Sequence, residues 1–327
     1  MSDDGRAGRA LAVALPREHE VATGGQRIGL ARSVIRRRLQ PSGYMYVALA
    51  FIYLGVFVLY PMGRTIWYSL TNAVLTSPTS GSFVGLANYR ELLSSGQLGQ
   101  SLYITLMYVL VVTTASMVLG VGCALLLERV KVGRRVLRTA LALPWAMPTI
   151  ATGVFFSIAF DPNVGILNIL LGRLHLSPVP WLTSNDVAFW SVCLVTVWTL
   201  FPFVMLVSVA ALQGVPKVLY DSASIDGAST WAQLRYVTLP TIAPTLRIVT
   251  VFEVIWTFQL FQIAYVLTGG GPINGTNFLV INLYKTAFDN QQLGSASAIG
   301  VVGLMLAAVV VAIYMLVERR AERVSAR

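Results

Sequence analysis

Charged side chains are scarce in this sequence, and their scarcity limits what the protein can be. Only 12% of the 327 residues are Asp, Glu, Lys or Arg, whereas 56% are hydrophobic. The mean hydropathy is +0.69. A soluble domain carries about 25% charged residues. This deficit argues against a water-soluble globular fold and points to a membrane protein.

Residue types that bind metals or act as nucleophiles are equally rare. The chain has two histidines, His19 and His175, and two cysteines, Cys123 and Cys193, which both lie in apolar runs. It contains no HExxH motif, no Cys/His cluster and no G-x-x-x-x-G-K-[ST] phosphate loop. We therefore expect no metal, no cofactor and no ATP bound by this chain, and we expect both cysteines to be small buried hydrophobes rather than a disulfide framework.

Long apolar runs account for the composition. A run of about 18 or more residues is long enough to cross the hydrocarbon core as a helix. The candidates are 43–62, 102–127, 137–160, 188–212, 241–267 and 295–317. The third contains Pro144 and Pro148, which a membrane helix tolerates only when other groups satisfy the freed carbonyls. The sequence predicts an all-α membrane protein with six transmembrane helices.

The net charge of +10 is distributed unevenly between the connections. Most of the 24 basic residues fall in the tail 1–42, in 128–138, in 213–247 and after residue 318, and the alternate loops hold only Arg64, Arg90, Arg173 and Lys285. An excess of Lys and Arg marks the cytoplasmic side. We predict cytoplasmic termini in the cell membrane, no nucleic-acid partner, a disordered tail over 1–42 without a cleavable signal peptide, and a second tail over 318–327.

A polar insert at 213–240 separates the fourth and fifth apolar runs. Pro216 suits the first turn of a helix, Gly227 permits a left-handed backbone, and Ser229 or Thr230 can cap a second short helix. Pro240 then fits the first turn of the next membrane helix. We expect two short helices joined at a glycine elbow, which would suit docking in another protein's cleft; an interfacial helix on the lipid surface is the alternative.

Glu253 is the exceptional acid, because it lies inside an apolar run. A carboxylate at that depth is costly and should face a water-filled cavity or a partner. At 100° per residue it shares a face with Trp256, Thr257, Leu260 and Ala264. This face could line a cavity for a hydrophilic solute such as a sugar, or it could hold neighbouring helices together through hydrogen bonds.

The fourth run carries Pro202 between Phe201 and Phe203. A proline inside a helix removes a backbone hydrogen bond and can kink the helix. A kink flanked by aromatic rings could shape a pore or gate, and simple packing is equally consistent with the sequence.

The spacing of 221–240 resembles the "EAA" loop of the membrane subunits of ATP-driven bacterial importers, with the pattern E-A-A-x3-G-x9-I-x-L-P. Here Asp221-Ser222-Ala223 is followed by three residues, Gly227, nine residues and Val237-Thr238-Leu239-Pro240. The substitutions are Asp for Glu, Ser for Ala and Val for Ile. The resemblance implies that the segment docks on a cytoplasmic ATPase through Asp221, Ser222, Ala223, Asp226, Gly227, Leu239 and Pro240.

Three further stretches resemble the carbohydrate-type permeases of the maltose and glycerol-3-phosphate group: FVGLANYRELL at 83–93, PWLTSNDVAFWSVCLVTVW at 180–198 and YVLTGGGPINGT at 265–276. The resemblance covers about 43–317. It implies a type I ABC importer permease (MetI/MalF-like) fold, a second permease subunit, two copies of an ATPase that binds ATP and Mg, and an external sugar-binding protein.

The same resemblance implies a substrate cavity at five positions, namely Phe201, Phe203, Glu253, Thr257 and Leu260. We therefore interpret the chain as a non-enzymatic transport subunit, with a disaccharide or oligosaccharide as the first candidate and glycerol phosphate derivatives or monosaccharides next. The alternatives are a secondary transporter in which Glu253 carries protons, which would need no docking loop, and an embedded enzyme, for which no nucleophile and base are present.

Overall fold

The computed structural model describes the backbone of residues 41–325 and the side chains of 45–316 except Ser80. The predicted tail 1–42 lies outside the described residues except for its last two. The chain divides into two units, Met1–Ile52 and Tyr53–Arg327. The described part of the first unit is helical and belongs to α1.

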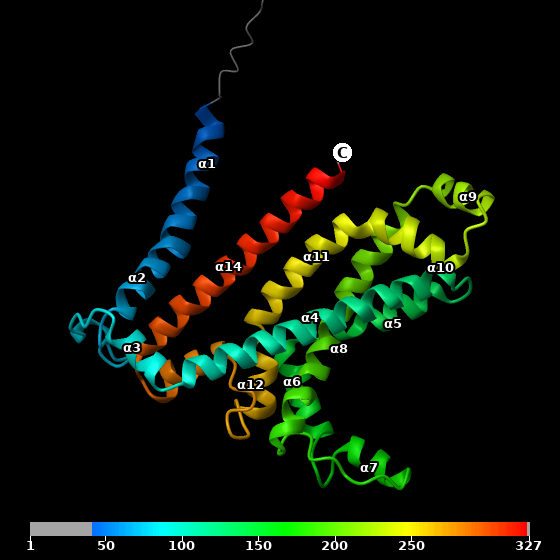
Figure 1. Cartoon of the computed structure of the whole chain (residues 1–327). Coiled ribbons are helices and arrows are strands. Elements are labelled where there is room, and N and C mark those ends of the chain that lie inside the picture. The colour runs from blue at the N-terminus through cyan, green and yellow to red at the C-terminus, as the bar shows by residue number, and fades with distance from the viewer. Residues whose placement is uncertain (1–40, 326–327) are drawn as a thin grey trace, which may run out of the picture. The chain divides into compact units, whose positions relative to one another are not determined.

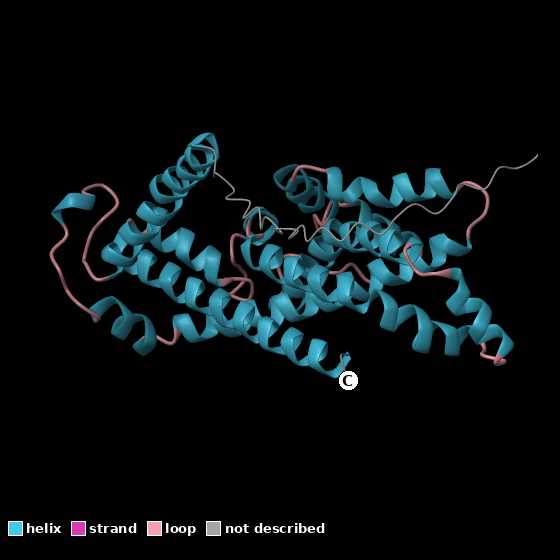
Figure 2. Ribbon diagram, turned by 90° about the horizontal axis from the view of Figure 1, so that it is seen from above, coloured by secondary structure: helices cyan, strands magenta, loops and turns pink. Residues whose placement is uncertain are grey.

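The described chain consists of helices joined by loops (Figures 1 and 2). The helices are α1 Pro41–Leu54, η1 Gly55–Leu59, α2 Tyr60–Ser69, η2 Pro78–Ser80, α3 Ala87–Ser94, α4 Gln97–Arg129, α5 Arg134–Ala146, α6 Thr149–Ala159, α7 Ile166–Arg173, α8 Asn185–Gln213, α9 Lys217–Ile225, α10 Thr230–Gln233, η3 Leu234–Thr238, α11 Leu239–Gln259, α12 Gln262–Thr268, α13 Leu279–Tyr284, η4 Lys285–Asp289 and α14 Leu293–Ser325. The predicted all-α class is confirmed.

Five helical segments within the described residues are long and apolar enough to cross a membrane, or six if one bent pair counts as a span. The continuous ones are Met45–Ser69, Gln97–Arg129, Asn185–Gln213, Thr230–Gln259 and Leu293–Leu316. The first runs seven residues beyond the predicted 43–62. After Leu316 the backbone of α14 stays helical to Ser325, so most of the predicted tail 318–327 is helix.

The third predicted span, 137–160, is not one straight helix. α5 and α6 meet at an angle of 95° across Met147 and Pro148. Met147 has ψ 137°, which is the extended backbone that a following proline favours. Because Pro148 also lacks an amide hydrogen, the helix ends at this point and a new helix begins at Thr149.

The fifth predicted span, 241–267, is wrong at both ends. Its helix begins at Thr230 and passes through the π-helical turn η3 before Pro240. The wider π turn removes the clash that a proline ring makes with the carbonyl one turn earlier. The helix ends at Gln259, Leu260 has ψ 71°, and α12 starts at Gln262.

The core lies mainly between α4 and α8, which pack along their length and also contact α11. Tyr108 of α4 is buried, and its hydroxyl lies 2.9 Å from Oγ1 of Thr196 on α8. Further along, a Cβ on Gly120 would lie 2.5 Å from the Cβ of Val204, so the two helices touch backbone to side chain. These contacts place α11, with Glu253, against the α4–α8 pair.

Candidate functional site

α9 is a short helix with a well-defined end. Pro216 precedes it as the N-cap, rather than standing inside its first turn. At its C-terminus the amide of Gly227 donates to the carbonyl of Ser224 at 3.1 Å, and that of Ala228 donates to Ala223 at 2.9 Å. This pair of bonds is the Schellman motif, which requires the left-handed conformation that Gly227 adopts with φ +74°. The predicted glycine elbow is therefore present.

The segment after the elbow differs from the prediction. Ser229 caps α10 by accepting a hydrogen bond from the amide of Ala232 at 3.3 Å, as one of the two expected caps. The predicted second short helix is not separate, however, because α10 continues through η3 into α11. The insert is one short helix, an elbow, and the first turns of a membrane helix.

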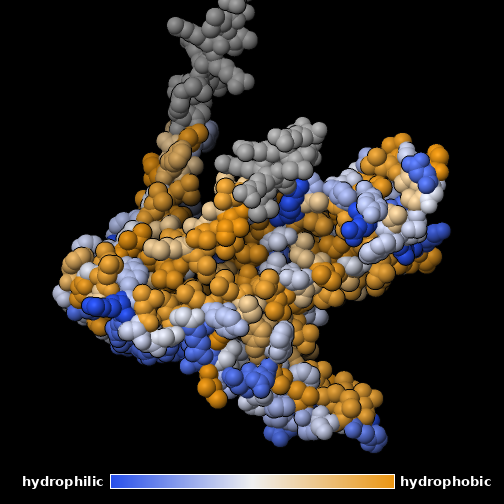
Figure 3. Space-filling view, viewed as in Figure 1, coloured by the Kyte–Doolittle hydropathy of each residue, from blue (hydrophilic) through white to orange (hydrophobic). Residues whose placement is uncertain are grey.

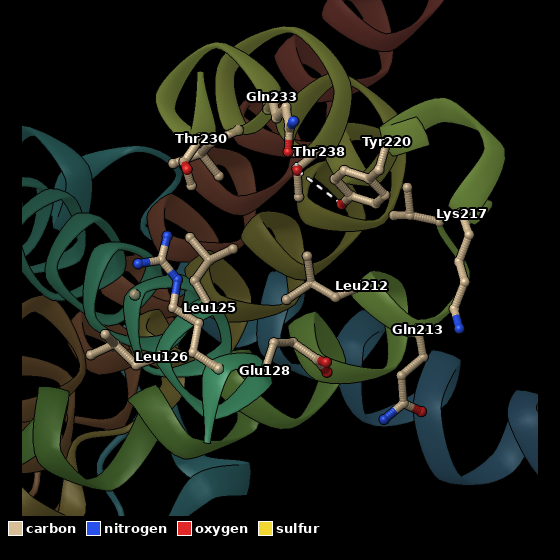
Figure 4. Close-up of a pocket in the computed structure, with 14 residues that line it drawn as sticks. Leu125, Leu126, Glu128, Leu212, Gln213, Lys217, Tyr220, Thr230, Gln233 and Thr238 are labelled. Atoms are coloured by element: carbon tan, nitrogen blue, oxygen red, sulfur yellow. Dashed lines mark hydrogen bonds between the residues drawn. The ribbon is translucent and has the colours of Figure 1, made fainter. Parts of the chain in front are cut away.

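Side-chain hydrogen bonds join α9 to that membrane helix. The hydroxyl groups of Tyr220 and Thr238 lie 2.9 Å apart (dashed line in Figure 4). The side-chain amide of Gln233 donates to Oγ of Ser224 at 3.1 Å and to the carbonyl of Ala228 at 3.3 Å. The sequence analysis did not predict a role for Tyr220, Gln233 or Thr238. Their polar side chains within the insert 213–240 are the feature that could have indicated one.

The outer face of α9 is apolar and exposed. Val218, Leu219 and Ile225 are 64%, 41% and 87% exposed. Figure 3 shows hydrophobic and hydrophilic side chains next to one another at this end of the molecule. Large exposed apolar side chains on a short protruding helix are typical of a docking surface. Of the residues predicted to couple, Asp221, Ser222, Asp226, Gly227 and Pro240 are exposed, and Ala223 and Leu239 are partly buried.

Ser222 and Asp221 differ in what they offer a partner. The hydroxyl of Ser222 donates to the carbonyl of Val218 at 2.9 Å, within its own helix. Asp221 has no hydrogen bond or ion pair with the described residues, so its carboxylate is free to meet a partner.

The polar face of α11 is buried rather than open. Glu253 is 0% exposed and Thr257, one turn later, is 1% exposed. Neither carboxylate oxygen of Glu253 nor the hydroxyl of Thr257 has a hydrogen-bond partner among the described residues. Leu260 ends the helix and Ala264 belongs to α12, so the single predicted face stops at Thr257. Within the described part of the chain, Glu253 and Thr257 therefore form none of the interhelical hydrogen bonds expected in the alternative interpretation.

Aromatic rings from three helices meet beside this face. The ring of Phe203 lies 4.8 Å from Trp256 and 5.8 Å from Trp145 of α5. Phe201, two residues before Phe203, is partly buried on another side of α8. Pro202 is buried inside α8, which continues as one helix to Gln213. Phe203 of α8 therefore packs against α11, the helix that carries Glu253.

Buried hydroxyl groups within the bundle form a further set that sequence reasoning missed. Four of them have no hydrogen-bond partner within the part of the chain that the structure describes, namely the hydroxyls of Thr113, Ser116, Thr152 and Ser208. The signal was the presence of Ser and Thr inside apolar runs. Buried polar groups without partners are rare and call for an explanation such as a bound solute or water.

The described chain thus combines long apolar helices, a short exposed helix at a polar loop and a buried acid without a partner among the described residues, and these features are typical of a membrane-spanning transport subunit. Residues 116–323 match the family described as "Binding-protein-dependent transport system inner membrane component". The chain belongs to this family, and it is a multi-pass permease subunit of an ABC transporter.

Relatives support this assignment over most of the chain. The trehalose/maltose permease MalF of Thermococcus litoralis is 34% identical over 88% of this chain and 97% of its own. The sulfoquinovosyl glycerol permease SmoG of Agrobacterium fabrum is 30% identical over 84% and 89%. A bacterial alginate ABC transporter chain has the same fold, with a TM-score of 0.76 and 20% identity over 85% of this chain and 94% of its own. The resemblance to carbohydrate-importer permeases is confirmed.

Proposed function

We propose that this chain is one of two membrane-spanning subunits of an ATP-driven carbohydrate importer. The exposed apolar face of α9 carries the proposal, because a monomeric membrane subunit has no need of a protruding apolar helix at a polar loop. The partners would be a second, homologous permease, two copies of an ATPase that holds ATP and Mg, and an external binding protein. In this proposal the termini and α9 lie on the cytoplasmic side, which the excess of Lys and Arg in the neighbouring loops supports.

The mechanism is alternating access without covalent chemistry. When the ATPases close, they would move α9 by their contacts with Asp221 and with the exposed apolar side chains of that helix. α9 is bonded to the start of α11 by Tyr220–Thr238, so the motion would reach Glu253. The unpaired carboxylate would accept hydrogen bonds from sugar hydroxyls, and Phe203 with Trp256 would offer an apolar ring surface. Phe201, Thr257 and Leu260 complete the proposed cavity.

The substrate class follows from the relatives and from this chemistry. Permeases named for trehalose and maltose and for sulfoquinovosyl glycerol carry glycosidic solutes. One buried acid disfavours a phosphorylated solute, because two negative charges would repel. A disaccharide or oligosaccharide is our first choice, ahead of glycerol phosphate derivatives and monosaccharides.

Reconstitution tests the proposal. The chain, with its genomic neighbours for the other subunits, would be placed in proteoliposomes containing ATP, and uptake of labelled trehalose, maltose and maltotriose would be measured. We expect ATP-dependent uptake of at least one sugar that requires the binding protein. Sugar uptake without ATP would refute the proposal.

A proton-coupled carrier using Glu253 is the second candidate, and the unpaired buried carboxylate is the observation that would favour it. Family membership disfavours it. Adding a protonophore to the same proteoliposomes separates the two functions. We expect import to continue, whereas collapse of import would favour the proton-coupled carrier.

A further inference from the structure

The short helix α7 turns its apolar side chains outward and its polar side chain inward. Ile166, Ile169 and Leu170 recur at three- and four-residue intervals and share one face with Arg173. The three aliphatic side chains are 52%, 43% and 46% exposed, whereas Asn168 on the opposite face is 9% exposed. A helix that lies against water buries its apolar stripe. The inverted pattern of α7 therefore indicates apolar surroundings.

Hydrogen bonds fix α7 in this orientation. The side-chain amide nitrogen of Asn168 donates to the carbonyl of Val179 at 3.1 Å. Its side-chain oxygen accepts from the amide of Val179 and from Nε1 of Trp181, both at 3.0 Å. The Trp181 ring lies 5.3 Å from the ring of Phe160, which is buried directly after α6. A roll of α7 that turned its aliphatic face inward would break all three bonds.

Exposed apolar side chains continue before and after α7 along the chain. Val164 precedes the helix, Leu174 and Leu176 follow it, and all three are exposed. Figure 1 shows α7 projecting away from the other helices, and Figure 3 shows hydrophobic side chains on this projection. Phe155 and Ile158 of α6, which belongs to the bent pair that could form one span, are exposed as well. The apolar surface thus runs from a membrane-crossing segment to α7.

We propose that α7 lies in the membrane surface as an anchor, with its aliphatic face among the acyl chains of one leaflet. A helix in this position buries its apolar face roughly 5–10 Å into the boundary between headgroups and acyl chains. Arg173, exposed at the end of the face, would extend its guanidinium toward the lipid phosphates. The orientation in the proposed function makes this the outer leaflet. The anchoring itself rests only on the chain crossing a membrane.

Other partners fit this face less well. A stable protein interface takes roughly 20–30 residues on each side, and α7 has only eight. Transient interfaces concentrate their binding energy in Trp, Tyr and Arg, and Leu and Val are under-represented. The sequence ILNILLGR offers aliphatic side chains and a single arginine. A polar ligand would find only that arginine on the exposed face, whereas a lipid surface matches all of it.

An anchor at α7 would hold the adjoining ends of two membrane helices. α7 follows α6 by way of Phe160, and Trp181 is joined to α8 because Oγ of Ser191 donates to its carbonyl at 2.8 Å. α8 also carries Phe203 of the proposed sugar cavity. Both helices would therefore keep their depth in the bilayer when α9 and α11 move.

Fluorescence quenching tests this placement in the full-length chain, reconstituted into vesicles with its partner subunits. Cys123 and Cys193 would be replaced by alanine, and an environment-sensitive dye would be attached to a new cysteine in Leu170→Cys. Ser177→Cys is the matched control, because Ser177 is exposed and lies two residues from Val179, which bonds to the opposite face of α7. One set of vesicles contains lipid with a nitroxide on its acyl chain, and another receives iodide in the water.

We expect the nitroxide lipid, and not iodide, to quench the dye at position 170, and the reverse at position 177. In the variant Ile166→Asp with Ile169→Asp, the dye at position 170 should lose its lipid quenching and become open to iodide, because two carboxylates would replace the aliphatic face. The same charges placed off that face, in Asn163→Asp with Ser177→Asp, should leave the lipid quenching unchanged.

Iodide quenching at position 170 in the otherwise unchanged chain would overturn the proposal, because the face would then lie in water. Quenching by neither reagent would assign the face to the second permease. Protection that appears only when the binding protein is added would assign it to that protein, and equal lipid quenching at both positions would mean that no single face is anchored. Each result would refute the anchor. Failure of ATP-driven sugar uptake would refute the proposed function and leave the quenching result to decide the placement of α7.

Discussion

The hydroxyl oxygen of Tyr220 lies 2.9 Å from Oγ1 of Thr238 and joins α9 to the start of α11. Oγ1 of Thr238 also lies 3.3 Å from the carbonyl oxygen of Gln233, and the Gln233 amide reaches Ser224 near the other end of α9. Lys217 and Tyr220 of α9 also line a cavity together with residues at the ends of α4 and α8. A displacement of α9 would therefore pass to α11.

Tyr220→Phe should weaken the link between ATP hydrolysis and transport. The substitution keeps the aromatic ring and removes the hydrogen bond to Thr238. Such a bond contributes about 1 kcal/mol, which changes an equilibrium constant by up to roughly five-fold. We expect fewer sugar molecules imported per ATP and unchanged co-purification of the ATPase, because the exposed face of α9 is intact. Uptake and hydrolysis in proteoliposomes measure both.

Tyr236→Phe is the matched control, since Tyr236 is 72% exposed and its hydroxyl has no hydrogen bond within the described chain. It should behave as wild type. A Tyr220→Phe variant with the wild-type ratio of sugar to ATP would show that motion reaches α11 by another route.

Gly227→Trp should abolish ATPase co-purification and uptake while membrane insertion continues. Gly227 has φ +74°, and no atom lies within 4 Å of its Cβ position, so a large side chain would project outward toward a partner. A left-handed backbone costs an ordinary residue roughly 1–2 kcal/mol, and less for Asn. Gly227→Asn should therefore retain much of the function.

Gly133→Trp controls for backbone strain. Gly133 has the same φ of +74° and equally open surroundings, but it lies in the connection before α5. It should leave ATPase binding intact. Equal loss in both tryptophan variants would mean that strain, and not docking, explains the effect at Gly227.

Local chemistry explains which features could be predicted from the sequence. The run lengths predicted the membrane helices, and the glycine elbow followed from the backbone freedom of Gly227. Pro144 and Pro148 indicated a bend near Met147. They did not indicate how large the angle between α5 and α6 would be, because two prolines in one apolar run also fit a single kinked helix. The end of α11 at Leu260 had no signal in the sequence, since Leu260 and Phe261 are ordinary helix residues and neither glycine nor proline marks the break.

The sites show the same division. Helical periodicity placed Glu253 and Thr257 on one buried face, but it wrongly carried that face on to Ala264. The Tyr220–Thr238 bond could not be foreseen, because it depends on how α9 folds back over η3. The contact of Phe203 with Trp256 likewise requires the distance between α8 and α11, which a single sequence does not contain.

Glu253→Met should stabilise the protein and reduce uptake. The two carboxylate oxygens are buried without partners, so an apolar side chain of similar length removes an unfavourable burial. A hydrogen bond to a charged group contributes about 1.5–3 kcal/mol, so apparent sugar affinity should fall roughly ten- to hundred-fold. Thermal melting in detergent and the sugar dependence of uptake measure the two effects.

Thr250→Ala is the control on the same helix, because among the described residues its hydroxyl donates a hydrogen bond only to the carbonyl of Leu246, at 2.8 Å. It should leave uptake unchanged. Loss of assembly in Glu253→Met, in place of a change in sugar dependence, would show that Glu253 holds helices together in the complete transporter.

Gly120→Ala and Gly122→Ala should have opposite effects on stability. A Cβ on Gly120 would lie 2.5 Å from the Cβ of Val204 and 2.9 Å from the amide nitrogen of Met205, whereas a Cβ on Gly122 would meet nothing within 4 Å. Overpacking costs about 1–3 kcal/mol, because α4 and α8 must separate along their contact. Alanine at the open site should instead stabilise the helix by about 0.5–1 kcal/mol.

Melting temperatures of the two variants in one detergent measure this difference directly. Gly120→Ala should melt below wild type. The double variant Gly120→Ala with Val204→Ala should recover only the part of the loss that comes from the Val204 Cγ1 methyl, 2.7 Å from the added Cβ, because alanine keeps the Cβ that lies 2.5 Å away. Equal melting temperatures for the two glycine variants would mean that α4 and α8 do not approach so closely in the membrane. Recovery by Val204→Ala would assign the cost to this contact, since a general loss of helix flexibility would not be relieved by shortening the facing side chain.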